Sequence, residues 1–250
     1  MGGAAAVLTR RRALGLAALL VVLVAYRVSS ARLPDFSSGL DVVVHAAIVI
    51  PAFAASIWIA LPLRKVGTKA LLGIAAVSAI AAVTLAFLGA ESAANAAKLA
   101  CYAAVGFWFL TLFEELWWIA LVAVLVPWVD IWSVAAGPTE YVVEQQPGLF
   151  ERIAVGFPNP GETATVNIGP PDIVFFALFL AAADRFALRV AWTWIGMAGL
   201  LSGTLVLLWA SEDVVGLPAL PAICLGFLLP NADLLLRNVR EARSRATSPE

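Results

Sequence analysis

Runs of apolar residues long enough to cross a lipid bilayer recur along most of this chain, and no other feature constrains its fold as strongly. A membrane-spanning helix needs about 20 predominantly apolar residues, and only helices or closed barrels satisfy every backbone polar group inside hydrocarbon. The chain has 250 residues, of which 62% are hydrophobic, and its mean hydropathy is +0.93. A soluble core of this size cannot bury so much apolar surface. The sequence therefore predicts an all-α polytopic membrane protein.

Charged residues and turn signals divide the apolar sequence into about eight expected transmembrane helices. The run from 94 to 136 is about twice as long as one membrane helix requires, and Glu114-Glu115 near its midpoint indicates a turn. We expect a bundle of these helices with one extramembrane loop that bears a small β-hairpin. The expected spans are Ala13–Tyr26, Leu40–Leu63, Ala70–Gly89, 95–113, 116–136, Pro170–Leu188, 190–210 and 216–236.

Basic residues are distributed unevenly between the segments that join these spans. If the N-terminus is cytoplasmic, twelve lysines and arginines fall on the cytoplasmic side and four on the other side. Such an excess marks the cytoplasmic side of a membrane protein. We therefore expect an integral protein of a prokaryotic plasma membrane, with both termini in the cytoplasm and loop 137–169 outside. The cytoplasmic set is Arg10, Arg11, Arg12, Arg64, Lys65, Lys69, Arg185, Arg189, Arg237, Arg240, Arg243 and Arg245, and the outside set is Arg27, Arg32, Lys98 and Arg152.

The only long expected loop, 137–169, contains signals for local structure. Residues 139–146 are expected to form a short amphipathic helix that ends at Pro147-Gly148. Two β-prone runs, 152–157 and 163–168, flank the turn sequence Asn159-Pro160-Gly161, which predicts a β-hairpin. A hairpin alone in water is marginally stable, so it requires the protein surface or a guest strand.

Two aspartates lie within, or just inside the end of, apolar runs. Asp130 is about fifteen residues into the fifth expected span and Asp172 stands at the start of the sixth, so both lie near the outer end of the membrane. A carboxylate inside hydrocarbon costs several kcal/mol, and such a residue indicates function by default. Two carboxylates that share a site do not both ionise easily, so one can act as acid and the other as base. That combination activates water against an amide carbonyl.

Two prolines interrupt the start of the last span, in the stretch Gly216-Leu217-Pro218-Ala219-Leu220-Pro221. Proline lacks a backbone N–H and leaves carbonyls unpaired. Irregular backbone at membrane depth is tolerated only where it is buried in protein or lines a cavity. We therefore expect this stretch to border a functional cleft.

Together, these three elements resemble a known family. Asp130 before an apolar Ser-Val stretch, Gly169-x-x-Asp172 at a following span and Pro218-Ala219-Leu220 in the last span are similar to the motifs of the presenilin and signal-peptide-peptidase family of intramembrane aspartyl proteases. The resemblance covers residues 115 to 236. It implies Asp130 and Asp172 as the catalytic dyad and the Pro-Ala-Leu stretch as a support for the active site and substrate.

The chain departs from the family pattern at two positions beside the acids. Val129 stands where the family usually has tyrosine, and Pro171 stands where it has glycine directly before the second aspartate. Proline stiffens the backbone and removes an amide donor.

The resulting expectation is an intramembrane aspartic endopeptidase that hydrolyses transmembrane helices, such as signal peptides or single-span proteins. We expect unwound substrate to add as a strand to the run Thr163–Ile168, with the Pro218–Pro221 backbone on the other side of the cleft. Alternatives are a catalytically impaired relative that binds transmembrane helices, a proton-coupled transporter that uses the acids as a relay, and, more weakly, the prepilin-peptidase type of protease. The expected substrate-binding residues are Gly169, Thr163, Val166, Pro218, Ala219 and Leu220.

The net charge and the few histidines and cysteines limit the classes of partner and cofactor that the protein can have. A net charge of −1 argues against nucleic acid as a partner, and the lone His45 and the scattered Cys101 and Cys224 lack metal-ligand spacing. We expect no cofactor, and as partners the bilayer and transmembrane-helix substrates. The expected organisation is an N-terminal four-helix membrane scaffold at 1–114, a catalytic membrane half at 115–236 and a polar C-terminal tail at 237–250.

Overall fold

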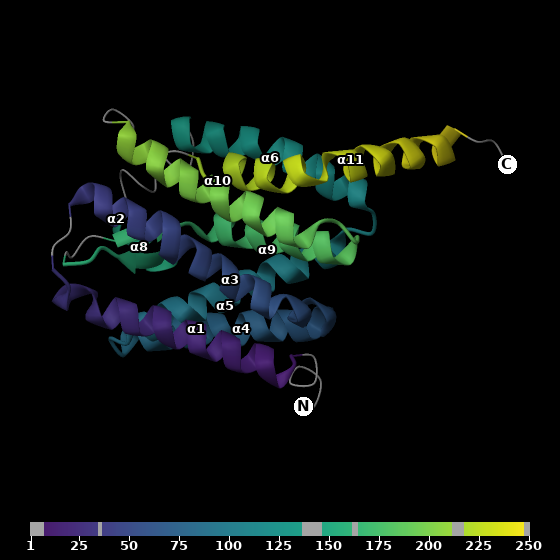
Figure 1. The fold of residues 1–250 in the computed structure, drawn as a ribbon. Coiled ribbons are helices and arrows are strands. Elements are labelled where there is room, and N and C mark those ends of the chain that lie inside the picture. The colour runs from purple at the N-terminus through teal and green to yellow at the C-terminus, as the bar shows by residue number, and fades with distance from the viewer. Residues whose placement is uncertain (1–7, 35–36, 137–146, 162–164, 212–217, 248–250) are drawn as a thin grey trace.

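The computed structural model describes residues 8–34, 37–136, 147–161, 165–211 and 218–247, which form a bundle of helices with a two-stranded hairpin at one end (Figure 1). Seven helical segments of this part are long and apolar enough to cross a membrane. The prediction of a mainly helical, polytopic membrane protein is confirmed to that extent. The segments are Arg10–Ser29, Ser38–Lys65, Thr68–Phe87, Glu91–Leu112, Leu116–Ser133, Val190–Ala210 and Leu220–Glu241.

The α-helices are named as in Figure 1. They are α1 (Arg10–Ser29), α2 (Ser38–Val44), α3 (Ile50–Ala60), α4 (Thr68–Phe87), α5 (Glu91–Phe109), α6 (Leu116–Ala136), α8 (Pro147–Ile153), α9 (Pro170–Arg185), α10 (Val190–Ala210) and α11 (Leu220–Thr247). Short helical turns extend some of them: η1 (Ser30–Arg32), η3 (Leu61–Lys65) and η4 (Leu110–Leu112) are 3₁₀ turns.

The second span is one continuous helical run that contains a π-turn. Helix α2 passes through η2 (His45–Val49), which is wound as a π-helix, into α3 and η3. A π-turn inserts an extra residue and disturbs the regular backbone pairing. The Ser202 hydroxyl on α10 donates a 2.7 Å hydrogen bond to the Ala46 carbonyl in this turn. Helix α10 thus contributes to the backbone pairing of the second span.

Helix α9 lies in the centre of the bundle and is the shortest of the helical segments found at the eight expected spans. Its 16 residues rise about 24 Å, less than the roughly 30 Å of a hydrocarbon core. All side chains from Phe176 to Ala183 are fully buried. Sequence predicted a span over Pro170–Leu188, but the helix ends at Arg185 and Ala187 adopts a positive φ of 53°. Helices α5, α11, α10, α3 and α6 all contact α9.

Small residues and stacked aromatic rings pack α9 against its neighbours. A Cβ at Gly106 of α5 would lie 2.4 Å from the Val174 carbonyl oxygen, so α5 approaches α9 at backbone distance there. The Phe179 ring stacks on Phe227 of α11 with centroids 4.8 Å apart, and the Phe176 ring meets Phe53 of α3 at 5.9 Å. One continuous apolar core therefore includes residues from both halves of the chain.

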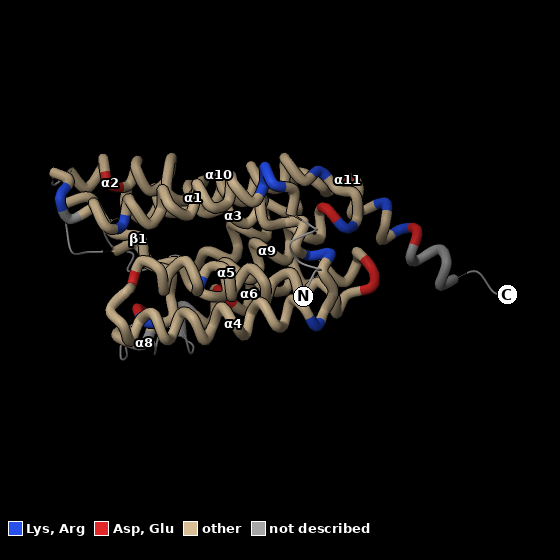
Figure 2. Tube along the Cα trace, turned by 90° about the horizontal axis from the view of Figure 1, so that it is seen from below, with Lys and Arg blue, Asp and Glu red and all other residues tan. Residues whose placement is uncertain are grey.

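Helix α1 begins and α11 ends at the same end of the bundle, which we call the terminal end; the hairpin lies at the opposite, hairpin end (Figures 1 and 2). Ion pairs fasten the terminal end: Arg64 pairs with Asp184, and Arg189 Nη1 with Asp233 Oδ1 at 2.6 Å. Helix α11 continues to Thr247, past the expected span boundary at 236.

The expected hairpin is confirmed, with different strand limits. Strand β1 (Val155–Pro158) pairs antiparallel with β2 (Thr165–Ile168), with Val155 opposite Ile168 and Phe157 opposite Val166. Residues 152–153, expected in the first strand, belong to α8. Pro147 begins this helix, because the first helical turn needs no amide donor from it. The helix expected at 139–146 lies outside the described residues.

Candidate functional site

Asp130 lies in the last third of α6, on the side near the hairpin end. Its side chain is partly buried, and its Oδ2 accepts a 3.1 Å hydrogen bond from the backbone N–H of Leu220. Leu220 is the first residue of α11, where backbone N–H groups have no partner within the helix. Asp130 therefore caps the start of α11 from a neighbouring helix.

Asp172 is the third residue of α9 and lies within the helix's own first turn. Pro170 and Pro171 occupy the first two helical positions, where their missing amide donors cost nothing. The Oδ2 of Asp172 accepts a 3.2 Å hydrogen bond from the Gly169 N–H, which closes the helix start. The positive end of the helix dipole favours a carboxylate at this place. Gly169 therefore acts through its backbone, as the residue that holds Asp172.

The structure brings the two acids into one region. The carboxyl groups of Asp130 and Asp172 are close enough for the charge of the first to act on the second. Each acid uses its Oδ2 as an acceptor, while Oδ1 of each accepts no hydrogen bond from the described part of the chain. Oδ1 of each acid is thus available to bind water or a polar group of a ligand.

The Pro-Ala-Leu stretch reaches the same region through its backbone. Pro218 and Ala219 are partly buried and not helical, and Leu220 begins α11 with a buried side chain. Pro221, which was expected to belong to the irregular stretch, is the second residue of the helix, because the first turn accepts proline. Residues 216 and 217 lie outside the described part. Cys224 lies one turn further along α11. Its side chain is buried and close enough to Asp130 for an electrostatic interaction.

No family model, curated protein or solved structure matches this chain.

Polar side chains from α1 and α5 hold the outer edge of β1. Lys98 Nζ donates to the Ala154 carbonyl at 2.8 Å, Arg27 Nη1 to Gly156 at 2.8 Å, and the Tyr26 hydroxyl to Pro158 at 2.8 Å. These alternate carbonyls therefore point away from β2. Sequence reasoning counted Lys98 and Arg27 only as topology markers; a lysine inside an apolar run was the signal that it has a buried partner.

The opposite edge of the hairpin, on β2, pairs with no strand in the described part of the chain. Because Ala154, Gly156 and Pro158 face outward from β1, the residues between them pair with Val166 and Ile168 of β2. The backbone groups of Thr165 and Asn167 then point away from β1, and no described residue bonds to them. Strand β2 leads through Gly169 directly into Asp172.

The substrate-binding role predicted for residues of this stretch stays a prediction, and the strand register shows which groups are available for it. The backbone of Val166 is directed at β1, so only its side chain is available to a ligand. Thr163 lies outside the described residues. The backbone groups available for strand pairing belong to Thr165 and Asn167, which the sequence did not single out because strand register was unknown. Within the described part of the chain, no three His, Cys, Asp or Glu side chains cluster so as to hold a metal ion.

Proposed function

We propose that this protein is an intramembrane aspartyl protease in which Asp130 and Asp172 form the catalytic dyad. The observation that carries the proposal is that two carboxyl groups from α6 and α9 lie in one region of an apolar bundle, each bound through Oδ2 to the backbone at a helix start. Acids at membrane depth are costly and therefore indicate function. The backbone hydrogen bonds fix the direction of both carboxyl groups, which general acid–base chemistry requires.

In the proposed reaction, one acid is ionised and the other carries a proton. The ionised carboxylate takes a proton from water as the water oxygen attacks the carbonyl carbon of the peptide bond. The protonated carboxyl group donates its proton toward the carbonyl oxygen. When the C–N bond of the tetrahedral intermediate breaks, the leaving nitrogen receives a proton from one acid, and one hydroxyl of the intermediate returns its proton to the other acid as it becomes the carbonyl. The two products are a carboxylic acid and an amine, and the dyad again holds one proton. The two acids titrate as a pair, so neither role is assigned to one residue.

The proposed substrate is a transmembrane helix that unwinds locally next to the dyad. Unwound peptide groups need new hydrogen-bond partners, because each unmet group costs several kcal/mol in hydrocarbon. The outward backbone groups of Thr165 and Asn167 offer such partners seven and five residues before Asp172. Strand addition to β2 would supply them and carry the unwound segment toward the dyad. Pro218 and Ala219 border the same region from the α11 side.

For the orientation, we propose that the hairpin end faces outward and the terminal end faces the cytoplasm of a prokaryotic cell. The arrangement of α1 and α11 supports this, because both termini lie at the end that carries most of the arginines and lysines (Figure 2).

A catalytically impaired relative that binds transmembrane helices is the second candidate. It is favoured by the same two hydrogen bonds, because each acid also has a structural role as a cap. Pro171, exposed beside Asp172, adds to this candidate because it offers no amide donor to a ligand.

Incubation of the purified protein in liposomes with a single-span peptide separates the two. A protease yields two fragments whose masses add up to peptide plus one water, and Asp130→Asn or Asp172→Asn removes both fragments. A binding protein retains the peptide uncleaved.

A further inference from the structure

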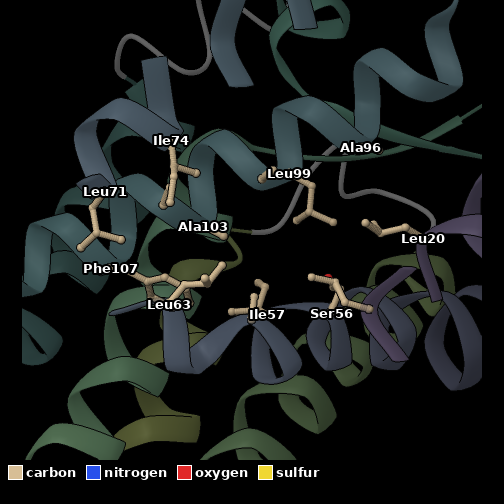
Figure 3. A pocket seen from close by; sticks show the side chains of 14 residues that line it. Leu20, Ser56, Ile57, Leu63, Leu71, Ile74, Ala96, Leu99, Ala103 and Phe107 are labelled. Atoms are coloured by element: carbon tan, nitrogen blue, oxygen red, sulfur yellow. The ribbon is translucent and has the colours of Figure 1, made fainter. Parts of the chain in front are cut away.

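An elongated apolar cavity of about 90 Å³ lies among α1, α3, α4 and α5 (Figure 3). Side chains from all four helices point into it, among them Leu20, Ile57, Leu71 and Phe107. The one hydroxyl in the lining, on Ser56, already donates a 2.6 Å hydrogen bond to the Phe53 carbonyl. An apolar cavity of this kind does not hold water. Its occupant, if it has one, is a hydrocarbon group.

The cavity has the length and position of a chain lying along the membrane normal. Its lining on α5 extends from Ala96 to Phe107, about 16 Å along the helix axis. All four helices that surround it belong to segments long and apolar enough to span a bilayer. The cavity therefore lies at hydrocarbon depth, parallel to lipid acyl chains.

A gap in the wall between α1 and α4 opens the cavity to the surface of the bundle. Helices α1 and α4 both line the cavity, yet they make only marginal contact with each other and are held by α3 and α5 instead. No residue of α1 is buried. Ala100 of α5 lines the cavity and is itself exposed, which marks the opening.

Exposed lysines lie at the terminal end of the same cavity. Leu63 and Leu71 line that end, and Lys65 and Lys69 stand within two residues of them in the chain. Arg64, which directly precedes Lys65, is occupied by its ion pair with Asp184. Lys65 and Lys69 are exposed and form no ion pair with a described residue.

We propose that this cavity is a lipid site, in which one acyl chain of an anionic phospholipid lies between α1 and α4 and its headgroup phosphate binds Lys65 and Lys69. A dry cavity open to the bilayer accepts the chain, and lysines at the membrane surface attract anionic headgroups. The occupant is a lipid of the surrounding membrane, and the site is independent of the dyad.

Native mass spectrometry of the purified protein tests the headgroup. The protein is equilibrated with equal amounts of phosphatidylglycerol and phosphatidylcholine that carry identical acyl chains. We expect retained phosphatidylglycerol to exceed phosphatidylcholine at least about fivefold, an energy difference that two surface lysines supply. Lys65→Gln with Lys69→Gln should bring the ratio near one. Arg237→Gln with Arg240→Gln removes two charges from α11 and should leave the preference unchanged.

A second set of variants tests the cavity. Ala100→Phe fills the opening and should abolish retention of both lipids, while Ala76→Phe, the same change on the exposed face of α4, should not. If Ala100→Phe lowers the thermal midpoint, Ala96→Leu replaces it as a smaller change in the lining.

Three outcomes would overturn the proposal. These are equal retention of the two lipids by the wild type, undiminished retention after the cavity is filled in a folded variant, and release of the lipid by excess inorganic phosphate, which would indicate a site for soluble anions.

Discussion

The backbone N–H of Leu220 donates a 3.1 Å hydrogen bond to Oδ2 of Asp130, and this bond joins α6 to the first residue of α11. Helix α6 contacts α11 extensively but barely touches α9, whereas α11 packs against both. The position of Asp130 relative to Asp172 is therefore set through α11. In this geometry, the Pro218-Ala219-Leu220 stretch holds one member of the proposed dyad through the Leu220 amide.

Replacing Leu220 by proline removes the amide that binds Asp130. Proline is tolerated at the first position of a helix, so the change deletes the donor with little effect on α11 itself. Leu220→Ala is the matched control, because it loses the buried side chain at a cost of about 2–5 kcal/mol in unfolding free energy but keeps the N–H. Hydrogen bonds to charged groups contribute about 1.5–3 kcal/mol. We therefore expect the cleavage rate of Leu220→Pro to lie about tenfold or more below that of Leu220→Ala, and equal rates would argue against this role of the bond.

The outward backbone groups of β2 lead to a second prediction, which compares two variants of Asn167. Asn167→Pro removes an outward amide and leaves the pairing with β1 intact, because proline is accepted at a sheet edge. Asn167→Ala keeps that amide. We expect a loss of cleavage of about tenfold for the proline variant alone, with no change in its thermal midpoint. Val166→Pro, by contrast, removes an inward amide and should weaken the hairpin itself. Wild-type cleavage by folded Asn167→Pro would eliminate strand addition to β2.

The orientation of the bundle is testable with cysteine labelling. Glu151 is exposed on α8 at the hairpin end, and Arg240 is exposed on α11 at the terminal end. In intact cells we expect a membrane-impermeant maleimide to label Glu151→Cys, and to label Arg240→Cys only after permeabilisation. The reverse labelling pattern would contradict the orientation proposed from the distribution of basic residues.

The crossing of α5 and α9 predicts a large effect of a single methyl group. A Cβ at Gly106 would lie 2.4 Å from the Val174 carbonyl oxygen and 2.7 Å from the Ala177 Cβ. Gly106→Ala should therefore lower the unfolding free energy by about 1–3 kcal/mol through overpacking. Gly73→Ala on α4 is the control, because nothing lies within 4 Å of its added Cβ. A thermal melt of both variants measures the difference, and equal midpoints would show that the crossing is looser.

Sequence periodicity and charge predicted the helical segments because hydrocarbon leaves few other solutions for the backbone. Glu114-Glu115 marked a turn between α5 and α6 correctly, and Asn159-Pro160-Gly161 marked the hairpin. The length of α9 was not predictable from hydropathy. Its apolar sequence reads like that of a lipid-facing span, but burial among the other helices lets a shorter helix suffice.

The two aspartates of the candidate site could be predicted from the sequence, but the backbone groups that bind them could not. Asp130 and Asp172 stood out because charges inside apolar runs are rare. Their partners are the backbone groups of Leu220 and Gly169, which no side-chain pattern reveals. The inward direction of Val166 depends on strand register, and a shift of one residue would have reversed it.

The most direct measurement compares the turnover of a single-span substrate by the wild type, Asp130→Asn and Asp172→Asn, together with the thermal midpoint of each. The asparagine oxygen still accepts the hydrogen bond from Leu220 or Gly169, so the caps and the fold are kept. General acid–base catalysis contributes about 10²–10⁴-fold, so each variant should lose at least about a hundredfold in rate with an unchanged midpoint. Wild-type turnover by either folded variant, or no turnover by any of the three proteins, would contradict a catalytic dyad and leave the two aspartates as helix caps.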